Sequence, residues 1–320
     1  MLCATLAAGL LVALVAGCTH SWQSRQPKAT ASVPSQNAGS TPLPSATPSP
    51  LPTVTATPPL AARVNGQPIL LSDFERQVAG AKGALLVQDV GPATADGEAA
   101  LAGLKQQVLE TMIDAALVEQ ASVDLGIVLG ATELDAQVRA DVTAGGGSLA
   151  FAEWLTATGQ TGEEYSAAVR ASLLLQRVAL AVTAGLPSQG EQVHLRRIDV
   201  DSLEAAEGIL AQLQQGADFA QSAAEFVLDT GSSGGAGDIG WVPRGLIEPQ
   251  AEAIVFALQP GEVTGAVALG NGNYALFQVV ERSADRPFSP GVQVELKAAA
   301  FRHWLADRRA NAVVDRLIGQ

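Results

Sequence analysis

The sequence predicts an α+β protein in which a helical domain is interrupted by a smaller α+β domain and preceded by a disordered tether. Three observations lead to this prediction. Residues 18–60 are rich in Pro, Ser and Thr, residues 72–185 carry apolar side chains at helical spacing, and residues 190–283 alternate between strand and helix periods. Residues 290–320 return to the helical period, so we expect the α+β domain to be inserted into the helical one.

The first 17 residues are almost wholly apolar and too short for a spanning helix, which is typical of a secretory signal. They end in Leu14-Val-Ala-Gly17, and Cys18 follows directly. This junction resembles the bacterial lipobox, which implies that residues 1–17 are a lipoprotein signal peptide and that Cys18 is lipidated. An ordinary signal peptide, or an N-terminal anchor with an incidental cysteine, is the alternative.

Residues 18–60 have the composition of a tether. They hold nine of the 17 prolines and no Asp or Glu. A stretch of this kind cannot bury enough apolar surface to offset the entropy of ordering it. We therefore expect an extended segment with polyproline character, which at ~3.1 Å per residue reaches about 130 Å from a membrane.

Residues 61–186 are expected to form the first part of the helical domain. Ala62 to Ile69 fit two short strands around an Asn65-Gly66 turn, and Ser72-Asp-Phe-Glu75 reads as a capping box that opens a helix. A second capping box is Thr161-Gly-Glu-Glu164. Side chains at four-residue spacing predict one buried helical stripe between them, formed by Leu104, Val108, Leu109, Met112, Ile113 and Leu117.

Residues 190–283 are expected to form the inserted α+β domain, after a break at Leu186-Pro187. The periods predict strands over residues 193–200 and 274–281, and helices over residues 202–215, 218–226 and 248–258. Residues 292–317 then predict a helix that packs on the first helical part. Its apolar face would consist of Phe301, Leu305, Val313 and Leu317.

Composition excludes several classes of function. The chain has 19 basic and 32 acidic residues, a net charge of −13, which argues against binding nucleic acid. Two cysteines exclude a disulfide scaffold or zinc ribbon, and three scattered histidines exclude a His-rich metal site. We therefore expect neither a metal nor an organic cofactor.

The glycine-rich segment from Phe226 to Trp241 admits two readings that we reject. Gly235-x-Gly237-x-x-Gly240 matches a dinucleotide fingerprint, but no helix start follows it. Asp229-Thr-Gly-Ser matches an aspartic protease signature, but that chemistry needs two carboxylates and the chain has no second copy. A dimer could use one copy, yet such enzymes are built of strands, whereas residues 203–226 are helical by pattern.

A third reading uses the whole domain. The ordered series of motifs from residue 193 to residue 281 resembles the parvulin-type peptidyl-prolyl isomerases, and the flanks resemble the helical chaperone domain of SurA/PrsA-type foldases. The flanking motifs are Val64-Asn-Gly66, Glu153-Trp-Leu155 and Ala300-Phe-Arg-His-Trp304. The parvulin-like motifs are Val193-His-Leu-Arg-Arg-Ile-Asp-Val200, Gly216-Ala-Asp-Phe219, Gly237-Asp-Ile-Gly-Trp241, Pro243-Arg-Gly245, Phe256-Ala-Leu-Gln-Pro-Gly-Glu-Val263 and Tyr274-Ala-Leu-Phe-Gln-Val-Val-Glu281.

The resemblance implies a set of site residues in which the polar pair of the family is replaced. Arg197 stands at its first histidine position and Ala275 at its second, while His194 points to the opposite strand face. The Cys-or-Asp position corresponds to Asp229, or to Thr230 if the loop shifts by one. The apolar proline pocket corresponds to Ile239, Ile247 and Phe256, and Ala251 stands where another Phe is expected.

The resemblance implies an extracytoplasmic foldase of the peptidyl-prolyl cis-trans isomerase class, lipid-anchored to a bacterial membrane. Its partners would be unfolded or secreted polypeptides that contain X-Pro. We expect weak catalysis because both histidines are replaced. The alternative is a non-catalytic holdase or assembly factor that uses a degenerate parvulin domain for binding.

Overall fold

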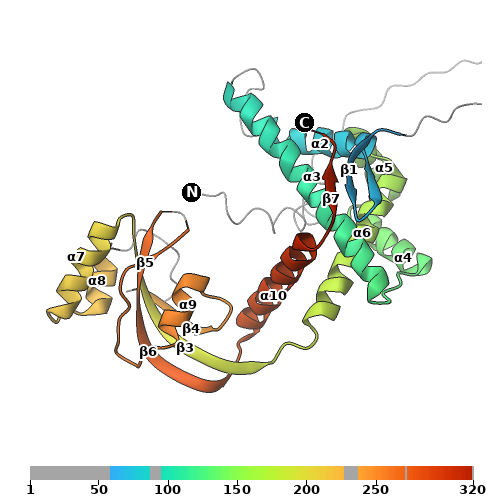
Figure 1. Cartoon of the computed structure of the whole chain (residues 1–320). Helices are drawn as coiled ribbons and strands as arrows, with labels where there is room; N and C mark the ends of the chain where they lie inside the picture. The colour runs from blue at the N-terminus through green and yellow to red at the C-terminus, as the bar shows by residue number, and fades with distance from the viewer. Residues whose placement is uncertain (1–57, 87–94, 227–236, 271, 319–320) are drawn as a thin grey trace, which may run out of the picture. The chain divides into compact units, whose positions relative to one another are not determined.

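The computed structural model describes residues 58–86, 95–226, 237–270 and 272–318 (Figure 1). These residues separate into two compact units. The first comprises the described parts of Met1–Val178 and Asp307–Gln320, and the second comprises those of Ala179–Ala306. The division falls inside two helices, α6 (Gly162–Thr183) and α10 (Pro290–Ala310). Mixed helical and sheet structure confirms the predicted fold class.

The described part of the first unit begins with two strands, which are followed by five helices. Strands β1 (Leu60–Val64) and β2 (Gln67–Leu70) form the predicted hairpin, in which Asn65 and Gly66 have positive φ angles of 50° and 86°. The helices are α2 (Leu71–Leu86), α3 (Ala95–Asp124), α4 (Ala131–Ala144), α5 (Ser148–Thr158) and α6. The stripe on α3 is buried as expected at Val108, Leu109, Ile113 and Leu117.

The capping box before α6 is confirmed. The Glu164 N–H donates to Thr161 Oγ1 at 3.1 Å, and the Thr161 N–H donates to Glu164 Oε2 at 2.8 Å. The backbone hydrogen bond from Thr161 is the largest reason why the pKa of Glu164 is lowered. The two bonds satisfy N–H groups that the first turn of a helix leaves without partners.

Helix α6 is long and apolar enough to cross a membrane by length and composition. Its side chains Tyr165, Val169, Leu174 and Val178 are nevertheless buried in the unit. Arg170 pairs with Glu119 of α3 at 2.7 Å, and Arg177 pairs with Glu133 of α4. These contacts are typical of a core helix in a folded domain.

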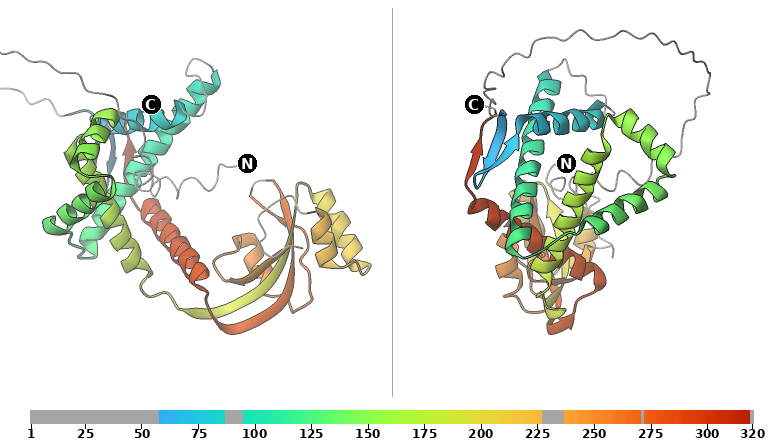
Figure 2. Two further views of the ribbon diagram at one scale, coloured as in Figure 1. Left: turned by 180° about the vertical axis from the view of Figure 1, so that it is seen from behind. Right: turned by 90° about the vertical axis from the view of Figure 1, so that its right-hand side faces the viewer.

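The end of the chain joins the first unit through a strand that the sequence analysis missed. Strand β7 (Val314–Arg316) pairs antiparallel with β1, so the sheet order is β2-β1-β7 (Figure 2). The expected helix over residues 292–317 was therefore wrong at its end, because α10 stops at Ala310 and the chain extends along β1. Val313 and Leu317 are consequently exposed, by 67% and 51%, instead of lying on a buried face.

Salt bridges and side-chain hydrogen bonds hold this terminal segment. Arg309 pairs with Asp114 at 2.5 Å and with Glu110 at 2.9 Å, both on α3. The Asn65 N–H donates to Val313 O at 2.8 Å, and the Val313 N–H donates to Asn65 Oδ1 at 2.9 Å. We call this arrangement the C-terminal anchor.

The second unit contains an antiparallel sheet with the order β4-β3-β6-β5. Its strands are β3 (Gln189–Val200), β4 (Asp238–Pro243), β5 (Val267–Ala268) and β6 (Tyr274–Pro287), and its own helices are α7 (Leu203–Gln214), α8 (Phe219–Phe226) and α9 (Pro249–Val255). Figure 1 shows α7 and α8 on one side of the sheet and α9 on the other. Strands β3 and β6 are longer than expected and pair from Val200↔Tyr274 to Gln189↔Pro287.

Each face of this sheet carries its own hydrophobic cluster. The first face, beneath α9, is formed by Val193, Leu195, Ile247, Ala251, Val255, Phe256, Val267, Ala275, Phe277 and Val279. The second face, beneath α7 and α8, is formed by Ile198, Val200, Ala206, Ile209, Phe219, Ala223 and Leu276. We call these the α9 face and the α7–α8 face.

Candidate functional site

Arg197, one of the expected site residues, lies on β3 and contacts the α9 face. Its guanidinium carbon is 5.4 Å from the centre of the Phe277 ring on the neighbouring strand. Its Nε donates to Asp199 Oδ1 at 2.7 Å, and its Nη1 donates to Glu248 Oε1 at 3.0 Å. Burial disfavours the charged guanidinium, but the two carboxylates outweigh it and raise the pKa of Arg197. Arg197 is therefore a fixed cation.

Glu248 is a site residue that the sequence analysis missed. It precedes α9 at the N-cap position, yet its side chain makes no capping hydrogen bond and reaches Arg197 instead. The two residues are 51 positions apart. No local pattern distinguishes a capping glutamate from one that pairs across a domain, so the sequence alone carries no signal for this contact.

The expected apolar pocket residues gather on the α9 face. Ile247, Phe256 and Ala275 belong to its cluster, and Ile239 packs against the edge. Their exposed fractions are only 9% for Ile247, 4% for Phe256 and 0% for Ala275. Ala251, which replaces an aromatic residue of the family pattern, is equally buried. The expected apolar residues are therefore clustered, but little of their surface is exposed to solvent.

An arginine covers the aromatic part of this cluster. The Arg244 guanidinium carbon lies 4.1 Å from the centre of the Phe256 ring. Glu191 holds it there, accepting from Arg244 Nε at 2.7 Å and from Arg282 Nη2 at 2.8 Å. The Arg282 side-chain bond is the largest reason why the pKa of Glu191 is lowered. A ligand that stacks on Phe256 must first displace Arg244.

The glycine-rich loop is described only from Gly237 onward, so Asp229 and Thr230 lie outside the described residues, as does Cys18. The end of the loop is fixed beside Arg197, whose N–H donates to Gly237 O at 2.8 Å. Gly237 has a φ of +73°, and a Cβ atom there would lie 2.4 Å from Arg197 O. Only glycine fits this close approach.

Asp238 braces the end of the loop. Its Oδ1 accepts from the Gly240 N–H at 2.8 Å and lies 2.9 Å from His194 Nε2. Burial raises the pKa of Asp238, but the bonds to His194 and Gly240 outweigh it and leave that pKa lowered. His194 alternates with Arg197 along β3 and so lies on the opposite face, stacked on Trp241 at 5.5 Å. It does not replace the missing histidine.

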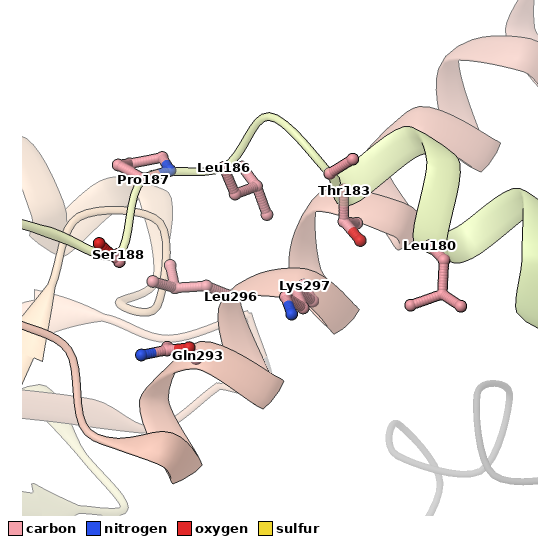
Figure 3. A pocket seen from close by; sticks show the side chains of 9 residues that line it. Leu180, Thr183, Leu186, Pro187, Ser188, Gln293, Leu296 and Lys297 are labelled. Carbon is pink, nitrogen blue, oxygen red and sulfur yellow. The ribbon is translucent and has the colours of Figure 1, made fainter.

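A pocket of about 280 Å³ lies elsewhere in the second unit, where the end of α6 and the first turns of α10 approach each other (Figure 3). Thr183, Ser188 and Gln293 are uncharged polar residues of its lining, and Lys297 carries the one charge among the lining residues. The apolar lining residues are Leu180, Ala184, Leu186, Pro187 and Leu296. The pocket contains none of the expected site residues.

Within the described parts of the chain, no three His, Cys, Asp or Glu side chains gather as metal ligands would. The α9 face presents one fixed cation and carboxylate oxygens beside an apolar cluster that is largely buried. Neither Arg197 nor Ala275, the two positions at which the resemblance implies a histidine, carries an imidazole.

Comparisons with known proteins match two family models to two parts of the chain. Residues 50–179 match the model of the SurA-like N-terminal domain, and residues 194–281 match the PPIC-type PPIase domain, named Rotamase. The Foldase protein PrsA of Caldanaerobacter subterraneus subsp. tengcongensis is 29% identical over 126 residues, which is 39% of each chain. The Chaperone SurA of Nitrosospira multiformis is 26% identical over 213 residues, covering 57% of this chain and 48% of that protein.

A crystal structure of the peptidylprolyl isomerase PrsA from Bacillus anthracis covers 62% of this chain and 89% of its own, with 18% identity and a TM-score of 0.46. The alignments with the first three curated relatives span 39% to 45% of the lengths of those relatives. The two family matches show that the chain contains a SurA-like N-terminal domain and a PPIC-type rotamase domain, and PrsA foldases and SurA chaperones are among its relatives.

Proposed function

We propose that this protein is an extracytoplasmic foldase and chaperone that binds unfolded or secreted polypeptides and isomerises their X-Pro bonds slowly. The observation that carries the proposal is the α9 face of the rotamase domain. Ile247, Phe256 and Ala275 pack together in its cluster, and the resemblance to the parvulins implies that Arg197 and Ala275 stand at the histidine positions. The scaffold for holding a proline is kept and the polar pair is replaced.

Weak catalysis by such a site is compatible with cis-trans isomerisation, because no covalent bond of the peptide breaks in that reaction. Rotation about a peptide bond costs ~18–20 kcal/mol, since amide resonance is lost in the twisted state. A site accelerates rotation when it binds the twisted amide more tightly than either planar form. Apolar contact can contribute to this on the α9 face, and an N–H of Arg197 not used by Asp199 or Glu248 can donate to a substrate carbonyl.

The direct test is an isomerase assay on the full chain with an X-Pro peptide, measured by protease coupling and by NMR exchange. Uncatalysed isomerisation takes tens to hundreds of seconds, so slow turnover is still detectable. We expect a small, saturable acceleration. The double substitution Arg197→His with Ala275→His should increase it, because both family histidines are then present. No acceleration in either protein would contradict the isomerase part of the proposal.

A second candidate, a non-catalytic holdase, is favoured by a specific observation. Asp199 and Glu248 already engage Arg197, and Arg244 covers Phe256, so the polar and aromatic groups of the site are in use. A holdase would suppress aggregation of an unfolded client while X-Pro isomerisation stayed at the rate of buffer. Light scattering of a refolding client, run beside the isomerase assay, separates the two candidates.

We also propose the lipid anchor and the tether. The Leu14-Val-Ala-Gly17-Cys18 junction supports processing before Cys18, and the proline-rich composition of residues 18–60 supports an extended tether. Metabolic labelling with a fatty acid should mark the wild-type chain and should fail with Cys18→Ser. Labelling that survives this substitution would contradict the anchor.

A further inference from the structure

The charges around Arg197 do not cancel. Asp199 and Glu248 both pair with this one arginine, so the three side chains together carry one net negative charge. Each carboxylate gives a single oxygen to the guanidinium. The other oxygens, Asp199 Oδ2 and Glu248 Oε2, accept no hydrogen bond from a described residue. The two side chains are exposed by 20% and 37%, so an incoming peptide can reach them.

The neighbouring charged residues leave this balance unchanged. Arg244 and Arg282 share Glu191, and Glu252 accepts from the Gly245 N–H at 2.5 Å beside Arg244. These two cations and two anions sum to zero. Over residues 190–283 the sequence has four basic and thirteen acidic residues, a net charge of −9. The local excess of negative charge therefore lies within a domain whose long-range field has the same sign.

We propose that Asp199 and Glu248 are specificity-determining residues, which select X-Pro segments with Lys or Arg beside the proline and disfavour Asp or Glu there. The inference rests on the proposed function, because it concerns what the α9 face of the rotamase domain binds. A client ammonium can approach the two carboxylate oxygens that Arg197 leaves open. A client carboxylate instead meets an arginine that is already paired, and must displace Asp199 or Glu248 to bind it.

The experiment measures binding and turnover on the full chain with three otherwise identical X-Pro peptides, in which X is Lys, Ala or Glu. Binding is followed by NMR titration and isomerisation by NMR exchange. Two partly exposed ion pairs predict about 3- to 10-fold tighter binding of the Lys peptide than of the Glu peptide at low salt. The ratio should fall below about 2-fold at ~0.5 M salt because the charges are screened.

Substitutions locate the preference. Glu248→Gln should lower the Lys-to-Glu binding ratio by about 2- to 5-fold. The matched control is Glu207→Gln. It removes the same charge from an exposed position of α7, which covers the other face of the sheet, and should leave the binding ratio unchanged. Asp199→Asn is the second variant, so that a folding defect in one variant, detected by circular dichroism, does not decide the result.

Three outcomes would overturn the inference. They are equal binding of the Lys and Glu peptides, preference for the Glu peptide, and an equal loss of the ratio in Glu207→Gln and Glu248→Gln. A preserved binding ratio without turnover of any peptide has another meaning. It contradicts the isomerase part of the proposed function and supports the charge selection, so the two failures are distinguishable.

Discussion

Arginine–carboxylate pairs occur in both units, but they have a structural role in the first unit and lie at the candidate site in the second. In the C-terminal anchor of the first unit, Arg309 joins α3 to the end of the chain, through residues 195 positions apart in sequence. In the rotamase domain, Arg197 pairs with Asp199 and Glu248 on the α9 face. The same kind of contact therefore holds the end of the chain in the first unit, whereas in the second unit it fixes an arginine over the Phe277 ring of the candidate site.

Removal of the Phe277 ring, over which Arg197 lies, should change stability most. Phe277 is fully buried at the centre of the α9 face. Phe277→Ala should lower the free energy of unfolding of the second unit by about 3–5 kcal/mol, through lost contacts and a residual cavity. Urea denaturation of the full chain, followed by NMR signals of each unit, measures this. An equal loss in both units would contradict an effect that is confined to the second unit.

The next effect concerns the close approach of the loop to Arg197. Gly237→Ala would place a Cβ atom 2.4 Å from Arg197 O at a positive φ, so we expect a loss of about 2–4 kcal/mol.

Gly240→Ala is the matched control, because it has a similar φ of +76° and no atom within 4 Å of the added Cβ. It should cost only about 1–2 kcal/mol, the cost of the left-handed backbone alone. Thermal denaturation of both variants compares them, and equal losses would show that the contact with Arg197 is relaxed rather than tight.

A smaller effect is expected in the C-terminal anchor. Arg309 is 35% exposed, and its partners Asp114 and Glu110 are 19% and 23% exposed. Arg309→Ala should therefore destabilise the first unit by about 1–2 kcal/mol, less than a fully buried pair would cost. Arg308→Ala is the control, since Arg308 and Asp124 are more exposed, and it should cost under about 0.5 kcal/mol. Hydrogen exchange at β7 reports which substitution releases the strand.

The smallest effect distinguishes the two units by pH. The folded pKa of Asp238 is lowered, so its stabilisation is present above the unfolded value of about 3.9 and is lost as pH falls through the folded pKa. The pKa of Asp114 is shifted in the opposite direction, because burial raises it despite the bond from Arg309. The stability that comes from this shift is present below the unfolded pKa of about 3.9 and is lost as pH rises through the folded pKa.

Asp238→Asn should therefore make the stability of the second unit less dependent on pH below about 4. The free energy of unfolding of Asp114→Asn, measured relative to the wild type, should be higher at neutral pH than at pH 3, because the variant has no carboxyl group to ionise. Denaturation curves from pH 3 to 7 measure how the free energy of unfolding of each variant depends on pH. If both substitutions changed this dependence in the same direction, the opposite pKa shifts of Asp238 and Asp114 would be contradicted.

The sequence predicted most of the elements because their patterns are local. The Asn65-Gly66 turn, the Thr161–Glu164 capping box and the α3 stripe involve neighbours within a few positions, and all three are present. It was wrong about residues 311–317. Their apolar spacing suits a helix, but pairing of β7 with β1 satisfies the backbone in extended form.

The order of the two domains follows from the sequence, and both match a family model. The apolar site residues and the replacement of both histidines stay predictions from the resemblance to the parvulins. The pairing of Glu248 with Arg197 and the position of Arg244 over Phe256 are visible only in the folded protein. The tertiary structure also decided that the last strand completes the first sheet. These contacts join residues 12 to about 250 positions apart, so their partners are set by how whole elements pack and not by any spacing along the chain.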